Sequence, residues 1–208
     1  MTFQADHNKT DTNRRPIHKL IGTLNELINT MQPNGAILIA INNEVIYEQY
    51  CGHADISKKI ATSSHTQYLI GSVTKQFTAV ALLNALYEKA KKNGIADNKL
   101  EINIKTALQK TVANYLPKDH DLWKAAMPAW ANTVTLHHLL IHSSGIPDYT
   151  SLPGFENQQS INAADLITFF KTHALEFIPG TKFTYSNSGY FLLGMIIQQL
   201  TSQPLDVY

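Results

Sequence analysis

The chain has 208 residues and a formal net charge of +1, from 17 Lys and Arg against 16 Asp and Glu. Its 44% hydrophobic and 16% charged residues indicate a globular protein with a buried core and exclude disorder over most of its length. The near-zero charge argues against binding to nucleic acid through the phosphates, because such binding needs a basic surface. We therefore expect no nucleic-acid partner.

A single cysteine, Cys51, excludes an intramolecular disulfide and a zinc site built from several thiolates. The N-terminal residues contain no apolar run typical of a secretory signal. The longest apolar stretches, 35–41 and 190–197, are far shorter than the roughly 20 residues that a membrane span needs. The sequence thus predicts no membrane span and leaves the compartment undetermined.

The chain is expected to begin with a flexible polar segment over residues 1–15, followed by a helix and a β-hairpin. Apolar residues recur every three or four positions over 17–31, as on one face of an amphipathic helix. Residues 36–41 and 44–50 favour two strands, and Asn42-Asn43 between them is typical of a tight turn because asparagine tolerates positive φ. A polar loop is predicted over 51–66.

The rest of the chain is predicted to be mostly helical, with helices near 72–92, 133–141, 163–175 and 188–201 and short helical stretches around 104–115. On the first of these, the residues expected to face the core are Val73, Phe77, Val80, Ala81 and either Leu83 or Ala85. Two strands followed only by helices are unusual, since a lone hairpin is marginally stable in water. We expect the hairpin to pack on helices, or further strands to follow residue 208.

Ser72 and Lys75 form a Ser-x-x-Lys pattern at the start of the predicted helix 72–92. Residues three apart share a helix face, so the hydroxyl and the amine can meet. That pairing supplies a nucleophile and a base, as acyl transfer requires. Such a tetrapeptide arises by chance about once in a chain of this length. An N-cap serine beside a solvated lysine therefore stays the alternative interpretation.

Tyr185-Ser186-Asn187 is the second candidate for chemistry. A tyrosine beside a lysine loses its proton more easily and can pass protons to a leaving group. The Asn187 amide offers a carbonyl and an NH₂ group, enough to bridge a lysine and a substrate amide. The alternative is a loop in which the tyrosine packs and the next two residues cap the following helix.

Three longer segments contain or adjoin these residues, and they are 70–79, 136–149 and 179–190. In this order they resemble the nucleophile segment, the turn after a short helix and the second catalytic motif of the serine β-lactamase and penicillin-binding-protein superfamily. The similarity is strongest to its class C-related branch of esterases and D-alanyl-D-alanine peptidases. The resemblance extends over about residues 35–205, nearly the whole chain.

The resemblance implies an α/β (α+β) fold of the β-lactamase/transpeptidase type. In it, helices flank an antiparallel sheet, and a helical domain is inserted after the first strands. Residues 16–208 would form an incomplete domain of this kind. Residues 16–66 would supply the terminal helix and first hairpin, and residues 67–208 the mostly helical part. The C-terminal strands of the sheet are expected to be missing from this chain.

The resemblance also implies acyl-enzyme chemistry on a β-lactam, a D-alanyl peptide or an ester. Ser72 matches the nucleophile, Lys75 its base, Tyr185 the proton relay and Asn187 the residue that steadies Lys75 and the substrate amide. The backbone N–H of Ser72 would form half of the oxyanion hole, whose donors lower the barrier by several kcal/mol. Neither a cofactor nor a metal is implied, and the substrate would be a small molecule or peptidoglycan-like. The family implies a periplasmic or secreted location.

The sequence departs from this family in one respect. A third motif, Lys-Thr-Gly or His-x-Gly, is expected downstream of Tyr185 and does not occur up to residue 208. We therefore expect a truncated form of a longer hydrolase. The alternative is a non-catalytic binding or self-assembling fragment, because an incomplete sheet leaves an open edge that invites pairing.

Other patterns are weaker. His138 and His142 are four residues apart, as zinc-binding histidines on a helix are, but no third ligand is evident. Trp123 and Trp130 favour a core patch over a binding wall, and Cys51 is expected to be a small buried residue.

Overall fold

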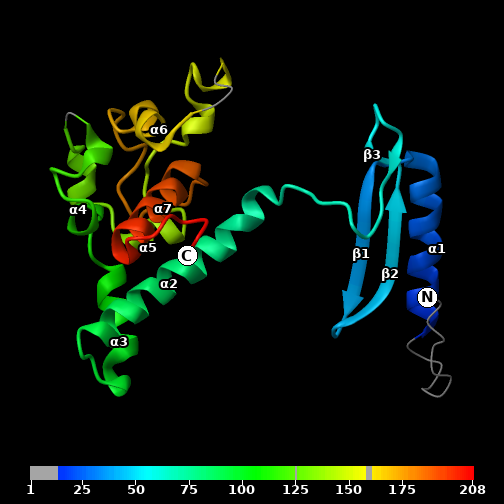
Figure 1. The fold of residues 1–208 in the computed structure, drawn as a ribbon, viewed down its shortest axis with the longest axis horizontal. Coiled ribbons are helices and arrows are strands. Elements are labelled where there is room, and N and C mark those ends of the chain that lie inside the picture. The colour runs from blue at the N-terminus through cyan, green and yellow to red at the C-terminus, as the bar shows by residue number, and fades with distance from the viewer. Residues whose placement is uncertain (1–13, 125, 158–160) are drawn as a thin grey trace. The chain divides into compact units, whose positions relative to one another are not determined.

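The computed structural model describes residues 14–124, 126–157 and 161–208, which fall into two compact units (Figure 1). The first unit ends at Leu69 and the second runs from Ile70 to Tyr208. Of the expected flexible segment 1–15, residues 1–13 lie outside the described residues, and Arg14 and Arg15 belong to the first helix. The helices and small antiparallel sheets agree with the predicted α/β class.

The first unit consists of helix α1 (Arg14–Met31) and two small sheets. Strands β1 (Gly35–Ile41) and β2 (Glu44–Cys51) form the predicted antiparallel hairpin. Asn42 and Asn43 adopt φ of 50° and 65°, which confirms the turn. Tyr47 and Cys51 are buried, and the Tyr47 hydroxyl donates a hydrogen bond of 2.8 Å to the side chain of Asn25 on α1. The expected burial of Cys51 is confirmed, and the contact with α1 agrees with the first of the two alternatives for the hairpin.

The predicted loop 51–66 is wrong in part, because it contains a second, shorter hairpin. Strands β3 (His53–Asp55) and β4 (Ile60–Ala61) pair antiparallel. The Asp55 carboxylate accepts hydrogen bonds from the Ser57 hydroxyl and the Lys58 N–H, which reverses the chain between the strands. This local side-chain bonding is not visible in the hydrophobic pattern.

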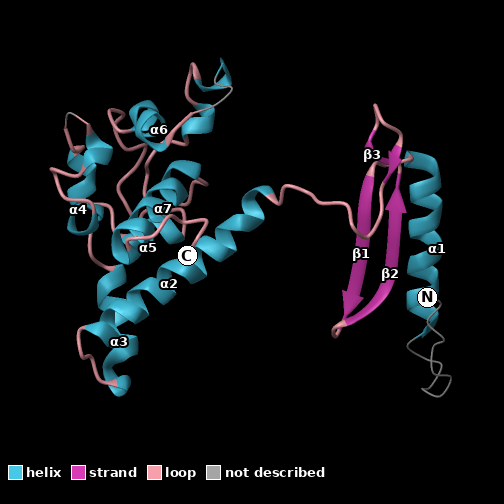
Figure 2. Cartoon of the chain, in the orientation of Figure 1, coloured by secondary structure: helices cyan, strands magenta, loops and turns pink. Residues whose placement is uncertain are grey.

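In the second unit the described residues form helices and loops, without a strand (Figure 2). A short 3₁₀ turn, η1 (Gly71–Val73), leads into α2 (Thr74–Lys92), which corresponds to the predicted helix 72–92. The other α-helices are α3 (Leu100–Leu108), α4 (Val112–Tyr115), α5 (Leu136–Leu140), α6 (Ala163–Phe170) and α7 (Asn187–Thr201). Short 3₁₀ turns lie between them, at 97–99, 121–123, 129–132, 149–151 and 155–157.

Capping residues set where two of the helices begin. The short helical stretches expected around 104–115 correspond to α3 and α4, which are separate because Thr111 forms a capping box with Asn114 and starts α4. The expected helix 133–141 begins only at Leu136, because Thr135 caps it by accepting a hydrogen bond from the His138 N–H. Helix α6 ends at Phe170, before the predicted end at 175, and the helices predicted over 17–31, 72–92 and 188–201 occur close to their expected positions.

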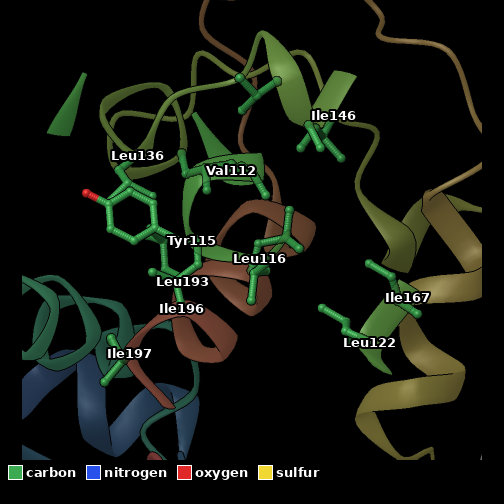
Figure 3. Packing of buried hydrophobic residues seen from close by; sticks show 14 of the residues in the cluster. Val112, Tyr115, Leu116, Leu122, Leu136, Ile146, Ile167, Leu193, Ile196 and Ile197 are labelled. Carbon is green, nitrogen blue, oxygen red and sulfur yellow. The ribbon is translucent and has the colours of Figure 1, made fainter. Parts of the chain in front are cut away.

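The core of this unit lies where α7 packs against α2 and α5. Leu193 and Ile196 of α7 and Leu136 of α5 are fully buried in it (Figure 3). The rings of Trp123 and Trp130 meet edge to face at 6.0 Å and are buried, which confirms the core interpretation of these tryptophans.

The predicted buried face of α2 is wrong in part, although Ala85 is buried and Ala81 packs against the core as expected. Val73, Phe77 and Val80 are 50%, 65% and 67% exposed. The core side instead carries Leu82 and Leu86, which pack with α7. Apolar residues occupy both sides of this helix, so periodicity alone could not select the side that α7 covers.

None of the described helices is both long and apolar enough to cross a membrane.

Candidate active site

Ser72 lies in the turn η1 that opens helix α2. Gly71 before it has φ of 51°, a left-handed conformation that suits glycine. The Ser72 side chain is exposed, and Lys75, one helical turn later on α2, is half-buried. Their side chains meet as the three-residue spacing predicted, since Lys75 Nζ donates to Ser72 Oγ at 3.1 Å.

Tyr185 and Asn187 lie at the start of helix α7. Ser186 caps this helix, accepting a hydrogen bond from the Gly189 N–H, and Asn187 is its first residue. The alternative interpretation of Ser186 as a helix cap is therefore correct, and it leaves the side chains on either side available for the site. Tyr185 is 41% exposed and Asn187 is half-buried.

The four candidate residues converge although 112 and 113 positions separate their two segments. The hydroxyls of Ser72 and Tyr185 share a hydrogen bond of 2.6 Å. Lys75 Nζ also donates to Asn187 Oδ1 at 2.8 Å. Ser72 thus contacts a phenol and an amine together, and both of these groups can accept its proton when they are in their basic forms.

The surroundings of Tyr185 make its hydroxyl more acidic than that of an ordinary tyrosine. Partial burial acts to raise its pKa, but the hydrogen bonds with Lys75 and Ser72 and the positive charge of Lys75 outweigh it, so the pKa lies below its ordinary value. The Lys75 ammonium lies 4.8 Å from the centre of the Tyr185 ring and 5.5 Å from that of Tyr190.

The ring of His142 packs against both tyrosines. The ring of His142 stacks on Tyr185 at 4.5 Å and packs against Tyr190 at 5.0 Å. His142 Nδ1 accepts a hydrogen bond from the Ser186 N–H, which requires that nitrogen to be unprotonated. Burial and the charge of Lys75 lower the pKa of His142, partly opposed by Asp148. His142 therefore orients Tyr185 as a neutral ring.

His138, which the sequence paired with His142 as a possible zinc ligand, has a structural role. His138 Nδ1 accepts from the Thr135 N–H at 3.2 Å, which completes the cap of α5. Within the part of the chain that the structure describes, no group of three or more His, Cys, Asp or Glu side chains is placed to hold a metal ion.

Sequence reasoning assigned no role to Asp148 or Ser188. The Asp148 carboxylate accepts from the Asn187 amide nitrogen at 2.9 Å and 3.3 Å. The buried Ser188 hydroxyl joins the turn around Asp148 to α7. Asp148 lies in the segment 136–149 that resembles the family, and this was the only feature of the sequence that could have indicated a role for it. The contact itself is long-range and leaves no local pattern.

The convergence of serine, lysine, tyrosine and asparagine at the starts of α2 and α7 defines a class of protein. The chain belongs to the Beta-lactamase family, whose family model matches residues 25–208. This confirms the family resemblance inferred from the three sequence segments.

Among curated relatives, the chain is 32% identical to "Protein flp" of Staphylococcus aureus (strain MW2), a match that covers 85% of this chain and 32% of the relative. It is 29% identical to "Penicillin-binding protein 4*" of Bacillus subtilis (strain 168), covering 89% of this chain and 36% of that protein. The chain thus spans about a third of the length of these relatives.

Solved structures show the same fold. A penicillin-binding protein from Bacillus halodurans superposes with a TM-score of 0.63 at 23% identity, over 89% of this chain and 52% of that one. An octameric penicillin-binding protein homologue from Pyrococcus abyssi also gives 0.63, at 26% identity, over 92% of this chain and 41% of that one. The predicted β-lactamase/transpeptidase-like fold class is confirmed.

Proposed function

We propose that Ser72 is the nucleophile of a serine hydrolase that works through an acyl-enzyme. The observation that carries this proposal is the double contact of Ser72 Oγ, with the Tyr185 hydroxyl at 2.6 Å and Lys75 Nζ at 3.1 Å. An N-cap serine beside a solvated lysine would not need either partner. Membership of a family of serine hydrolases supports the same assignment.

The proposed reaction proceeds in two steps. Ser72 Oγ attacks a carbonyl carbon while its proton passes to Tyr185 or, through it, to Lys75. The bond to the leaving nitrogen or oxygen then breaks, and Tyr185 returns the proton to that atom. Water, deprotonated by the same pair, attacks the acyl carbon. The bond to Ser72 Oγ breaks, the pair returns the proton to Oγ, and the acid is released. Asn187 holds Lys75 throughout by accepting its hydrogen bond.

The proposed substrates are amides and esters of the family's kind, which are β-lactams, D-alanyl peptides and simple esters. Two matched proteins bear the name penicillin-binding protein, which supports the first two classes. The exposure of Ser72 and Tyr185 is compatible with a substrate of peptide size. No cofactor enters the proposed reaction, since the side chains alone supply nucleophile, base and acid.

Intact-protein mass spectrometry tests the nucleophile. The protein is incubated separately with a fluorescent penicillin and with an activated fluorophosphonate, beside Ser72→Ala and beside Ser151→Ala, an exposed serine of the same unit. We expect a single adduct on the parent and on Ser151→Ala, and none on Ser72→Ala. A folded parent protein that takes up neither reagent would refute catalysis by this chain.

A second candidate function is self-association without catalysis. The exposed side chains of Phe77 and Val80 line a groove of about 920 Å³ together with Leu205 and Tyr208. Burying such apolar surface against another copy would be favourable by about 25 cal/mol per Å². The octameric homologue from Pyrococcus abyssi shows that one protein of this fold assembles.

Light scattering during size-exclusion chromatography separates the two candidates. Self-association predicts a mass above 23.2 kDa that falls towards it in Val80→Asp. The matched control is Lys92→Asp, on the same helix and outside this groove. A parent protein that elutes as a monomer over a range of concentrations would contradict the association candidate.

A further inference from the structure

The amide of Asn187 lies between two groups of opposite charge. On one side the Lys75 ammonium, a donor without lone pairs, contacts Oδ1 at 2.8 Å. On the other side the Asp148 carboxylate, an acceptor, receives Nδ2 at 2.9 Å and 3.3 Å. The three side chains form a row of lysine, amide and carboxylate.

This row has only one favourable orientation of the amide. If the Asn187 group rotated by half a turn, its NH₂ would face the ammonium and its oxygen would face the carboxylate. Both hydrogen bonds would be replaced by contacts between like partial charges. Lys75 and Asp148 both favour the same orientation of the Asn187 amide. The carboxylate therefore stabilises the orientation in which Oδ1 faces Lys75.

Asp148 is itself held on two sides. Its Oδ1 accepts from the Thr150 N–H at 3.1 Å, which caps the short turn that follows. The Ser188 hydroxyl, which is fully buried, donates to the Pro147 carbonyl at 2.6 Å and accepts from the Tyr149 N–H at 2.9 Å. Ser188 follows Asn187 directly on α7, and its hydroxyl binds the residues on either side of Asp148. The backbone that carries the carboxylate is therefore fixed to the helix that carries the amide.

We propose that Asp148 is a positioning residue that sets the orientation of the Asn187 amide and, through it, the place of Lys75 beside Ser72. The positioning follows from the contacts themselves, whereas its consequence for rate rests on the proposed acyl-enzyme function. Displacing a base by about 1 Å is enough to slow a reaction about 100-fold. We expect loss of the carboxylate to slow acylation by about 10-fold to 100-fold.

Nuclear magnetic resonance tests the positioning without any need for activity. In ¹⁵N-labelled protein, the side-chain NH₂ pair of Asn187 is assigned by its loss in Asn187→Ala. Asp148→Asn and Asp148→Ser both keep an oxygen to cap the Thr150 N–H but remove the carboxylate. We expect the NH₂ pair to shift in both variants, and to stay in place in Asp165→Asn, a matched control on α6 whose carboxylate pairs with Lys124. An unchanged pair in the folded Asp148 variants overturns the inference.

A double-mutant cycle on the acylation rate tests the consequence. If Asp148 acts through Asn187, Asp148→Asn should slow acylation in the parent and have little further effect in Asn187→Ala. Equal losses in both backgrounds would show an effect that does not pass through Asn187 and would overturn the proposed route. A parent without a Ser72 adduct would instead refute the proposed function, and the resonance shift would still decide the positioning.

Discussion

At the scale of single residues, the site is defined by the environment of two hydroxyl groups. Ser72 and Tyr185 share a short hydrogen bond, and Lys75 lies beside both. The tyrosine is the more readily deprotonated of the two, because a phenol is a stronger acid than an alcohol. Burial raises the pKa of Tyr185, but the hydrogen bonds and the charge of Lys75 outweigh burial and bring it below its ordinary value. The tyrosine hydroxyl, and not its ring, is thus the feature that the proposed mechanism needs.

Tyr185→Phe separates the hydroxyl from the ring. Phenylalanine keeps the stacking on His142 and removes the contact with Ser72. We expect acylation to slow by about 100-fold to 10,000-fold with little change in stability, which is the usual range for losing a general base. Stopped-flow acylation and urea unfolding measure the two quantities. The control Tyr87→Phe, an exposed tyrosine on α2, should acylate at the parent rate; a similar loss there would contradict the assignment.

His142 should make stability depend on pH. Burial and the charge of Lys75 lower its pKa in the folded protein, so the unfolded chain binds more protons once the pH falls below about 6.5. The contribution of His142 to the free energy of unfolding should therefore be complete above about pH 6.5. It should decrease as the pH falls from there towards the folded-state pKa. Protonation would also place an N–H against the Ser186 N–H.

Urea unfolding at pH 7.5 and pH 5.5 checks this expectation. His142→Asn is the informative variant, because asparagine tolerates the φ of 56° at this position and does not titrate. The loss of stability between the two pH values should be smaller in His142→Asn than in the parent. His173→Asn, at an exposed histidine, should keep the parent's loss. An undiminished loss in His142→Asn would show that other groups are responsible.

At the scale of elements, backbone contacts hold the turn 142–149 against the segment that leads to α7. The Glu176 N–H donates to the Gly145 carbonyl, the Gly180 N–H to Ser143 and the Thr184 N–H to His142. These contacts bring the tyrosine segment to the histidine ring. The site therefore depends on these two loops as well as on α2 and α7.

Gly145→Ala tests how closely these segments must approach. Gly145 has φ of 74°, and a Cβ there would lie 2.4 Å from the Phe177 carbonyl oxygen, which belongs to the backbone and cannot turn aside. Left-handed strain and overpacking together should reduce the free energy of unfolding by about 2–4 kcal/mol. Gly22→Ala on α1, where a Cβ meets nothing within 4 Å, is the control and should not destabilise. Urea denaturation measures both, and equal stabilities would contradict the close approach.

At the scale of the whole molecule, the buried apolar cluster lies entirely within residues 82–197, in the second unit. In the described part of the first unit, the buried residues are Tyr47, Cys51 and Thr62. All four candidate catalytic residues belong to the second unit. Most of the hydrophobic stabilisation should therefore come from the part that also carries the site.

Residues 70–208 expressed alone should fold. We expect a helical far-ultraviolet circular dichroism spectrum and a cooperative urea transition, because the cluster needs no residue before Leu82. Trp123→Ala in the same fragment removes a fully buried ring and should lower the free energy of unfolding by about 3–5 kcal/mol. A fragment that lacks a cooperative transition would show that residues before 70 are required for this core.

The sequence by itself determined what depends on neighbours in the chain. The hairpin turn at Asn42-Asn43, the helix 74–92 and the meeting of Ser72 with Lys75 follow from positive φ, periodicity and the three-residue spacing. The four candidate site residues were identified from local motifs and their resemblance to a family.

Only the tertiary structure decided which surfaces meet. It placed Asn187 against Lys75, turned Phe77 outwards although it is apolar, and set Asp148 behind the amide. Such contacts join residues far apart in the chain, and they depend on which helix face and which loop find complementary partners. Local patterns do not contain that information, because both faces of α2 are apolar and the partners of Asp148 lie on another element.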